Sequence, residues 1–156
     1  MNVIVVRSDG SWYVRPDTSI ERESPEFYLP DGFSSVETHN CIWIRIIKAG
    51  KAVNPKFAGR YFDSFGKGVT IYCKEENSDG VCPFVDGSTL IRQETHPLEC
   101  LETEAPEMLH TAATIAEAVC RISRVTSIRI GDLFLFESAA SATLHRRQEA
   151  GGVAVL

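Results

Sequence analysis

The residues best placed for chemistry are a histidine and a cysteine in one β-rich segment. His39 and Cys41 are two positions apart, so on a strand both side chains face the same side. Imidazole and thiolate are zinc ligands, and Cys73 or Cys82 is available to complete such a site. A thiolate beside a base would alternatively be a nucleophile. No CxxC or HxxxH motif supports the zinc site, and buried cysteines are more often small apolar residues, so we favour a structural role.

Strands are the main elements expected to position these residues. Runs of β-branched and aromatic residues between turn residues predict strands. These runs cover residues 3–6, 12–14, 36–49, 69–73, 88–93 and 127–136. Asn54-Pro55 predicts the start of a short helix that ends at Gly66 and Gly68. A longer amphipathic helix is predicted where Thr114 and Glu117 have the spacing of a capping box.

Composition and charge limit the class of protein. The 156 residues are 44% hydrophobic and 24% charged, which predicts one domain over residues 1–145 and a flexible tail over 146–156. The net charge of −5, with no basic cluster beyond Arg146-Arg147, argues against a nucleic-acid partner. No apolar run is long enough to cross a membrane. The N-terminus has no secretion signal and the five cysteines are predicted to be thiols, so we expect a cytoplasmic protein.

Several short motifs follow one another along the chain in a fixed order. They occupy residues 15–20, 27–30, 44–46, 50–51, 57–63, 86–88 and 130–134. Their series resembles the fumarylacetoacetate hydrolase family. The resemblance implies an α+β, mostly β fold: a mixed β-roll of the type found in the C-terminal domain of that family, with two or three helices. It also implies a homodimer and a divalent cation that helps to cleave or decarboxylate small 2-oxo or 1,3-dicarbonyl acids.

The sequence departs from that family where the family holds its cation. The family's Glu-x-Glu pair aligns with His39 and Cys41, and its third carboxylate aligns with Thr70. Its active-site lysine precedes the segment that begins at Asp86 and aligns with Pro83. Magnesium and manganese prefer oxygen ligands, so these replacements predict that the family's metal-dependent reaction is absent.

Two further segments differ from the family, and one position is kept. The family's His-Glu lid segment is predicted to be deleted near residues 7–11, where the first strand leads directly to Trp12. The family's Thr-Gly-Thr-Pro loop aligns with residues 137–140, which include Ser138. Arg15 keeps the position of a basic residue of the family and is expected to attract a carboxylate ligand.

These departures predict a protein that is catalytically inactive or much altered. We expect it to bind a small oxo-acid-like ligand or a protein partner, as a homodimer without a cofactor. The predicted degenerate pocket comprises Arg15, His39, Cys41, Thr70, Pro83, Asp86 and Ser138. The alternative is an active hydrolase or lyase of small 2-oxo or 1,3-dicarbonyl acids, in which His39 and Cys41 hold magnesium, manganese or zinc. A third alternative is a protein without a selected activity.

Overall fold

A computed structural model describes residues 1–24, 26–108, 110–145 and 153–154 of the chain. The strands are β1 (Val3–Val6), β2 (Trp12–Arg15), β3 (Ile20–Glu21), β4 (Glu26–Phe27), β5 (Phe33–Arg45), β6 (Ser64–Glu75), β7 (Val81–Cys82), β8 (Thr89–Pro97), β9 (Leu133–Glu137), β10 (Ala142–His145) and β11 (Val153–Ala154). The α-helices are α1 (Leu101–Glu104) and α2 (Ala112–Ser123). Short 3₁₀ helices cover Asp17–Ser19, Pro55–Arg60, Leu98–Cys100 and Pro106–Met108.

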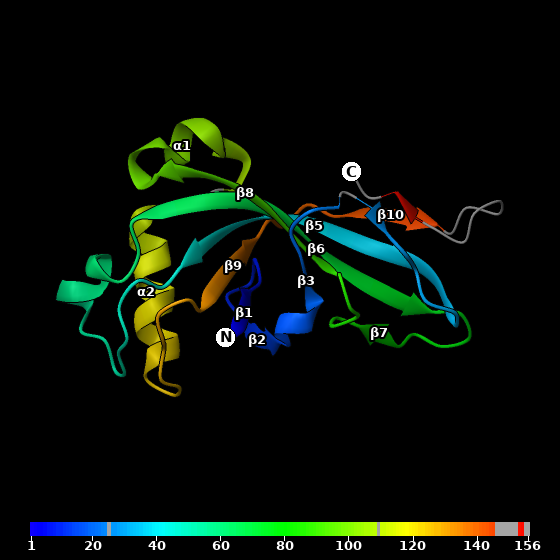
Figure 1. Ribbon diagram of the computed structural model, residues 1–156, viewed down its shortest axis with the longest axis horizontal. Helices are drawn as coiled ribbons and strands as arrows, with labels where there is room; N and C mark the ends of the chain where they lie inside the picture. Colours follow the sequence, from blue (N-terminus) through cyan, green and yellow to red (C-terminus); the bar gives the residue numbers. More distant parts are fainter. Residues whose placement is uncertain (25, 109, 146–152, 155–156) are drawn as a thin grey trace.

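One mixed sheet dominates the fold, in the strand order β2-β1-β9-β5-β6-β8-β3. β1 runs parallel to β9 and β3 parallel to β8, while the other pairs in this order are antiparallel. β5 and β6 are long, curved strands that cross the molecule (Figure 1). β10 also pairs with β5, and β7 pairs with β6. The predicted mostly β, mixed fold with few helices is confirmed.

The tail predicted over residues 146–156 falls mainly outside the description. Residues 146–152 and 155–156 lie outside the described residues. Val153–Ala154 forms β11, which pairs with β4 antiparallel.

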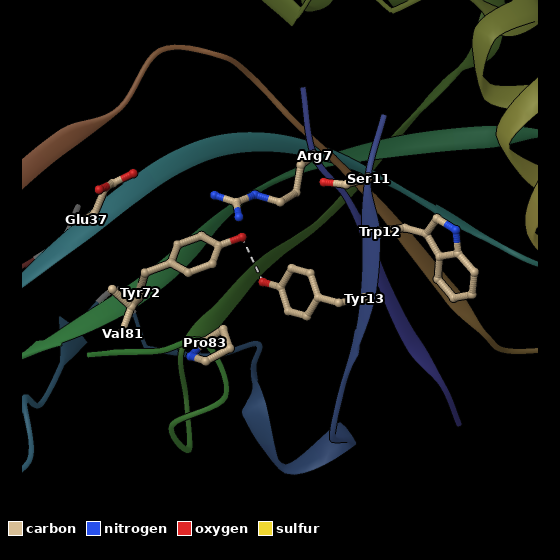
Figure 2. Close-up of a pocket in the computed structure, with 8 residues that line it drawn as sticks. All are labelled: Arg7, Ser11, Trp12, Tyr13, Glu37, Tyr72, Val81 and Pro83. Atoms are coloured by element: carbon tan, nitrogen blue, oxygen red, sulfur yellow. Dashed lines mark hydrogen bonds between the residues drawn. The ribbon is translucent and has the colours of Figure 1, made fainter. Parts of the chain in front are cut away.

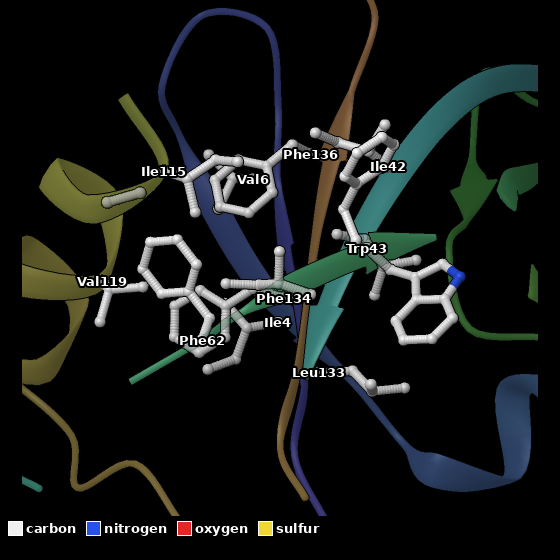
Figure 3. Packing of buried hydrophobic residues seen from close by; sticks show 14 of the residues in the cluster. Ile4, Val6, Ile42, Trp43, Phe62, Ile115, Val119, Leu133, Phe134 and Phe136 are labelled. Atoms are coloured by element: carbon white, nitrogen blue, oxygen red, sulfur yellow. The ribbon is translucent and has the colours of Figure 1, made fainter. Parts of the chain in front are cut away.

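A large apolar core lies between α2 and the strands β1, β9 and β5 (Figure 3). Phe134 of β9 is fully buried and pairs with Ile4 on one side and Ile44 on the other. α2 adds Ile115 and Val119, which are four residues apart and therefore share one helix face. The Asp132 carboxylate joins the start of β9 to the N-terminus, because it accepts hydrogen bonds from the backbone N–H groups of Asn2 and Arg129.

The start of α2 differs from the predicted one. Thr111 is the N-cap, and its hydroxyl accepts a hydrogen bond from the backbone N–H of Thr114. The Thr114 hydroxyl in turn accepts one from the backbone N–H of Thr111, so the capping box is Thr111 with Thr114. The predicted pair of Thr114 and Glu117 was wrong by one turn. A threonine at the third helical position replaced the glutamate or glutamine expected in this motif.

The two glycines predicted to end the short helix belong to β6 instead. A Cβ atom on Gly66 would lie 2.3 Å from the ring of Trp43, and one on Gly68 would lie 2.5 Å from the carbonyl oxygen of Leu90. Close approach of neighbouring strands, and not helix termination, therefore requires glycine here. The short helix itself begins at Pro55 as predicted and is of the 3₁₀ type, with the Asn54 side chain as its cap.

Among the described residues, no helix combines the length and the apolar character needed to cross a lipid bilayer.

Candidate functional site

A cavity of about 530 Å³ opens where the β1–β2 hairpin faces β5, β6 and β7 (Figure 2). The residues that line it are Arg7, Ser11, Trp12, Tyr13, Glu37, Tyr72, Val81 and Pro83. The register explains how β5 and β6 contribute. Glu37 lies directly opposite Tyr72, so both side chains point to the same face of the sheet.

A buried carboxylate, Glu137, lies next to the cavity at the end of β9. Its side chain is 2% exposed. The Tyr72 hydroxyl donates to both carboxylate oxygens at 2.8 Å, and the Thr70 hydroxyl donates to Oε2. Arg7 Nε lies 3.7 Å from Oε1. The two hydroxyl donors and the nearby Arg7 charge offset the cost of burying a negative charge.

Two tyrosines extend this arrangement as a chain of directed hydrogen bonds. Arg15 Nε donates to the Tyr13 hydroxyl at 2.8 Å, and the Tyr72 hydroxyl donates to Glu137 at 2.8 Å. Between them, the Tyr13 hydroxyl donates to the Tyr72 hydroxyl, also at 2.8 Å (Figure 2). Burial raises the pKa of both Tyr13 and Tyr72, and the charge of Glu137 raises that of Tyr72 further. Both phenols therefore stay protonated in neutral solution, and neither is a base.

Arg15 is the inner end of this chain and does not line the cavity. Its side chain is 1% exposed, and the guanidinium donates to the carbonyl oxygens of Ser88 and Ile71 and to the Thr89 hydroxyl. It also lies 4.9 Å from the centre of the Tyr72 ring. The sequence placed Arg15 next to the ligand; the structure places it behind Tyr13.

His39 and Glu37 form a second polar group on the same face of β5. His39 Nε2 lies 2.8 Å from Glu37 Oε1, and Nδ1 donates to the carbonyl oxygen of Ser138 at 3.1 Å. Lys74 Nζ lies 3.3 Å from the other Glu37 oxygen. The hydrogen bond from His39, followed by that from Lys74, lowers the pKa of Glu37. Both nitrogens of His39 are thus engaged with oxygen atoms.

The zinc site considered from the sequence would need His39 and Cys41 to meet Cys73 or Cys82, and the structure keeps these cysteines apart. Cys41 is buried next to Glu137, and burial followed by the Glu137 charge raises the pKa of its thiol, which opposes a thiolate ligand or nucleophile. Cys73 and Cys82 pack in a separate apolar cluster, on the face of β6 opposite to Thr70 and Tyr72. Across the described ranges, no three His, Cys, Asp or Glu side chains form a group able to hold a metal ion.

The predicted pocket residues are divided between three places. Pro83 lines the cavity, while His39, Cys41 and Thr70 form the layer beside Glu137. Asp86 is exposed on the turn before β8. Ser138 contributes its carbonyl oxygen to His39, and its hydroxyl donates to the carbonyl oxygen of Ala140.

Sequence reasoning missed Glu137, which is the central acid of the site. The predicted strand ends at residue 136 and residues 137–140 align with a family loop, so Glu137 is not among the predicted pocket residues. The alternation of Leu133, Leu135 and Glu137 is the signal that could have placed the carboxylate on one face of β9. Arg7 and Tyr72 were missed too, because their meeting depends on strand pairing.

Comparison with known proteins identifies the fold. The structure resembles fumarylpyruvate hydrolase from Pseudomonas aeruginosa, solved with Mn²⁺ and pyruvate, with a TM-score of 0.72 and 13% identity over 94% of this chain and 81% of that one. It also resembles maleylpyruvate hydrolase from Sphingobium sp. SYK-6, with a TM-score of 0.72 and 10% identity over 92% of this chain and 61% of that one.

A third structure belongs to a protein assigned to the fumarylacetoacetate hydrolase family, from Yersinia pestis CO92. It gives a TM-score of 0.65 and 14% identity, over 92% of this chain and 83% of that one. The chain therefore has the fold of the fumarylacetoacetate hydrolase family, as the sequence motifs predicted. No family model and no curated protein sequence matches the chain.

Proposed function

We propose that the protein binds a small carboxylic acid of the 2-oxo acid class in this cavity, and that it is catalytically inactive or much altered. The observation that carries the proposal is the position of Arg7. Its side chain lines the cavity, is 47% exposed, and extends over the Tyr72 ring at 5.3 Å (Figure 2). The Glu137 contact involves Nε, so the terminal N–H groups are directed to the cavity, where they match a carboxylate.

The balance of charge around the cavity supports an anionic ligand. Arg7, Arg15 and Lys74 carry positive charge, and the negative charges of Glu37 and Glu137 offset two of the three. Glu37 is engaged by Lys74 and His39, and Glu137 by Arg7, so the excess positive charge is that of Arg15, which lies behind Tyr13 at the wall of the cavity. The aromatic rings of Tyr13 and Tyr72 face the cavity and suit the planar body of a 2-oxo acid, whereas the Trp12 ring lies on the other side of β2 (Figure 2).

The residues present do not fit the hard divalent cation that the family's reaction needs. Magnesium and manganese take oxygen ligands in near-octahedral geometry. The three aligned positions offer the His39 imidazole, the Cys41 thiol and the Thr70 hydroxyl. Two carboxylates lie beside them, and both are engaged. Glu137 accepts hydrogen bonds at both oxygens, and Glu37 contacts His39 and Lys74. We therefore assign this chain no step that passes through a metal.

Ligand binding is tested by calorimetric titration with pyruvate. We expect saturable binding, which Arg7→Gln weakens at least about tenfold, since a charge-assisted pair is lost. Arg129→Gln, which changes an exposed arginine outside the cavity lining, is the matched control and is expected to bind normally. Methyl pyruvate, which lacks the carboxylate, is expected not to bind. Equal affinity of the wild type and Arg7→Gln would contradict the proposal.

Loss of catalysis is tested separately with acylpyruvates, oxaloacetate and fumarylacetoacetate. The purified protein is incubated with each compound, with and without magnesium or manganese, and product is followed by absorbance. We expect no turnover above that of the buffer. Metal-dependent turnover would overturn this half of the proposal and would favour the alternative, an active hydrolase or lyase with an altered metal site.

We also infer from the family resemblance that the protein is a homodimer and acts in the cytoplasm. Sedimentation velocity would test the first point, and a species with the mass of one chain would contradict it.

A further inference from the structure

Two cysteines lie directly opposite each other where β7 pairs with β6. The register places Cys73 against Cys82 and Lys74 against Val81, so the two cysteine side chains share one face of the strand pair. Both pack in the same apolar cluster, in which Cys73 is fully buried and Cys82 is partly buried. The two thiols are therefore neighbours, although they are separated by a turn in the sequence.

The strand register gives the approximate backbone spacing of this pair. The Glu75 backbone N–H donates to the Gly80 carbonyl oxygen at 3.0 Å, so Glu75 and Gly80 form a hydrogen-bonded pair. Hydrogen-bonded and non-hydrogen-bonded pairs alternate along antiparallel strands, which makes Cys73 and Cys82 a hydrogen-bonded pair too. The Cα atoms of such pairs are about 5.5 Å apart. That Cα distance lies within the range that disulfides span, but the Cβ atoms of a hydrogen-bonded pair are also about 5.5 Å apart, beyond the roughly 3.5–4.5 Å of a disulfide. The bridge therefore requires the two-residue strand β7 to shift toward β6.

The environment determines which sulfur reacts first. Burial, followed by the neighbouring Cys82 thiol, raises the pKa of Cys73 to about 12. Cys82 is partly exposed at the surface strand and is open to a small reagent. A reagent in solution therefore meets Cys82 first, and Cys73 lies behind it. The raised pKa of Cys73 keeps its thiolate scarce at neutral pH, so its attack on the mixed disulfide is the slow step.

We propose that Cys73 and Cys82 form a redox site, which small-molecule disulfides such as glutathione disulfide convert to an intrachain disulfide. The sulfur of Cys82 attacks one sulfur of the reagent, which forms a mixed disulfide and releases the first small thiol. The sulfur of Cys73 then attacks Cys82 and releases the second. Two protein thiols are oxidised, one reagent disulfide is reduced to two thiols, and the two cysteine protons end on those thiols.

The bridge would fix one wall of the cavity. β7 is two residues long and its strand pairing, within the described chain, is with β6 alone. Val81 and Pro83, which flank Cys82, point to the cavity while Cys82 points to the apolar cluster behind it. The oxidised form should therefore hold the wall in place. This consequence for ligand binding rests on the proposed function, whereas the disulfide itself does not.

The experiment treats the native protein with glutathione disulfide and then counts free thiols after denaturation. We expect the count to fall from five to three, with a mass lower by two hydrogen atoms. Trypsin cleaves after Lys74, so the bridge should join peptides 68–74 and 75–92, and dithiothreitol should separate them. Cys82→Ser should keep its four thiols under the same treatment, and Cys100→Ser, the matched control, should lose two.

Two results would overturn the inference. One is a stable mixed disulfide at Cys82, which would show that Cys73 does not resolve it. The other is a thiol count that stays at five at equilibrium. Peptide mapping of the wild type distinguishes the intrachain disulfide from both of these results, so the test does not depend on whether Cys82→Ser folds. Slower hydrogen exchange in residues 76–85 after oxidation tests the fixed wall independently, and pyruvate titration of the oxidised form tests its effect on the proposed ligand.

Discussion

The apolar core under α2 and the polar network beside the cavity are built on the same strands but are stabilised differently. In the core, Phe134 and its neighbours make non-directional apolar contacts, and their contribution to stability is roughly proportional to the apolar area removed from water. In the network, Tyr72 and Glu137 depend on one donor meeting one acceptor at 2.8 Å. The core therefore supplies most of the stability of the fold, whereas the network fixes the positions of side chains around the cavity at the cost of a buried charge.

The largest expected effect is on the core. Phe134→Ala should lower the free energy of unfolding by about 3–5 kcal/mol, since it removes a buried ring and leaves a cavity. Urea unfolding measures the change, which should be the same at neutral and at alkaline pH because no titrating group is involved. Ile130→Ala, at a 72% exposed position, is the control and should change stability by less than about 0.5 kcal/mol. A loss below about 1 kcal/mol in Phe134→Ala would break the comparison.

The next effect concerns the network. Tyr72→Phe should cost about 1.5–3 kcal/mol at neutral pH, since Glu137 loses a donor and Tyr13 loses its acceptor. The pKa of Tyr72 is raised in the folded state, so above pH 10.0, its ordinary value, the unfolded chain releases the proton first and wild-type stability falls.

The difference between Tyr72→Phe and the wild type should therefore shrink in strongly alkaline buffer. Tyr28→Phe, at a 69% exposed tyrosine, is the matched control and should leave stability unchanged within about 0.5 kcal/mol. If the two variants behave alike, the network does not contribute to stability as described.

A smaller effect on stability is expected at the second polar group of the site, formed by His39 and Glu37. Glu37→Gln should cost about 0.5–1 kcal/mol in neutral buffer, because Glu37 contacts His39 and Lys74 at the surface. The pKa of Glu37 is lowered in the folded state, so this contribution is present above its ordinary value of 4.5 and is lost as the pH falls through the folded value. Acid unfolding curves should therefore converge at low pH. Glu102→Gln, an exposed carboxylate of α1, should show no such dependence.

The smallest effect on stability belongs to Arg7. Arg7→Gln should cost no more than about 1 kcal/mol, since the side chain is 47% exposed and its ion pair at 3.7 Å is weak. Thermal unfolding measures this. A small loss of stability combined with a large loss of pyruvate affinity would assign Arg7 to ligand binding, and a large loss of stability would assign it to the fold.

The sequence predicted the strand-rich fold because its signals are local. Alternating and β-branched runs mark strands over a few residues, and turn residues mark their ends, so the hairpin of β1 and β2 and most of β5 and β9 were found. The replacement of the family's carboxylates by His39, Cys41 and Thr70 depends only on the order of motifs and stays a prediction.

Errors arose where a contact distant in sequence decided the outcome. Gly66 was read as a helix end, but the Trp43 ring packs against it inside β6. Glu137 was read as a loop residue, but the partners that retain it in the interior, Thr70 and Tyr72, are more than sixty positions away. A sequence pattern cannot show which strand will supply such partners.

The class of fold therefore follows from the sequence alone, because it depends on residue type and order along the chain. Only the tertiary structure decided that Arg7, Tyr13 and Tyr72 meet Glu137, and that Cys73 faces Cys82. The physical reason is strand register: a shift of one residue would turn each of these side chains to the opposite face of its sheet.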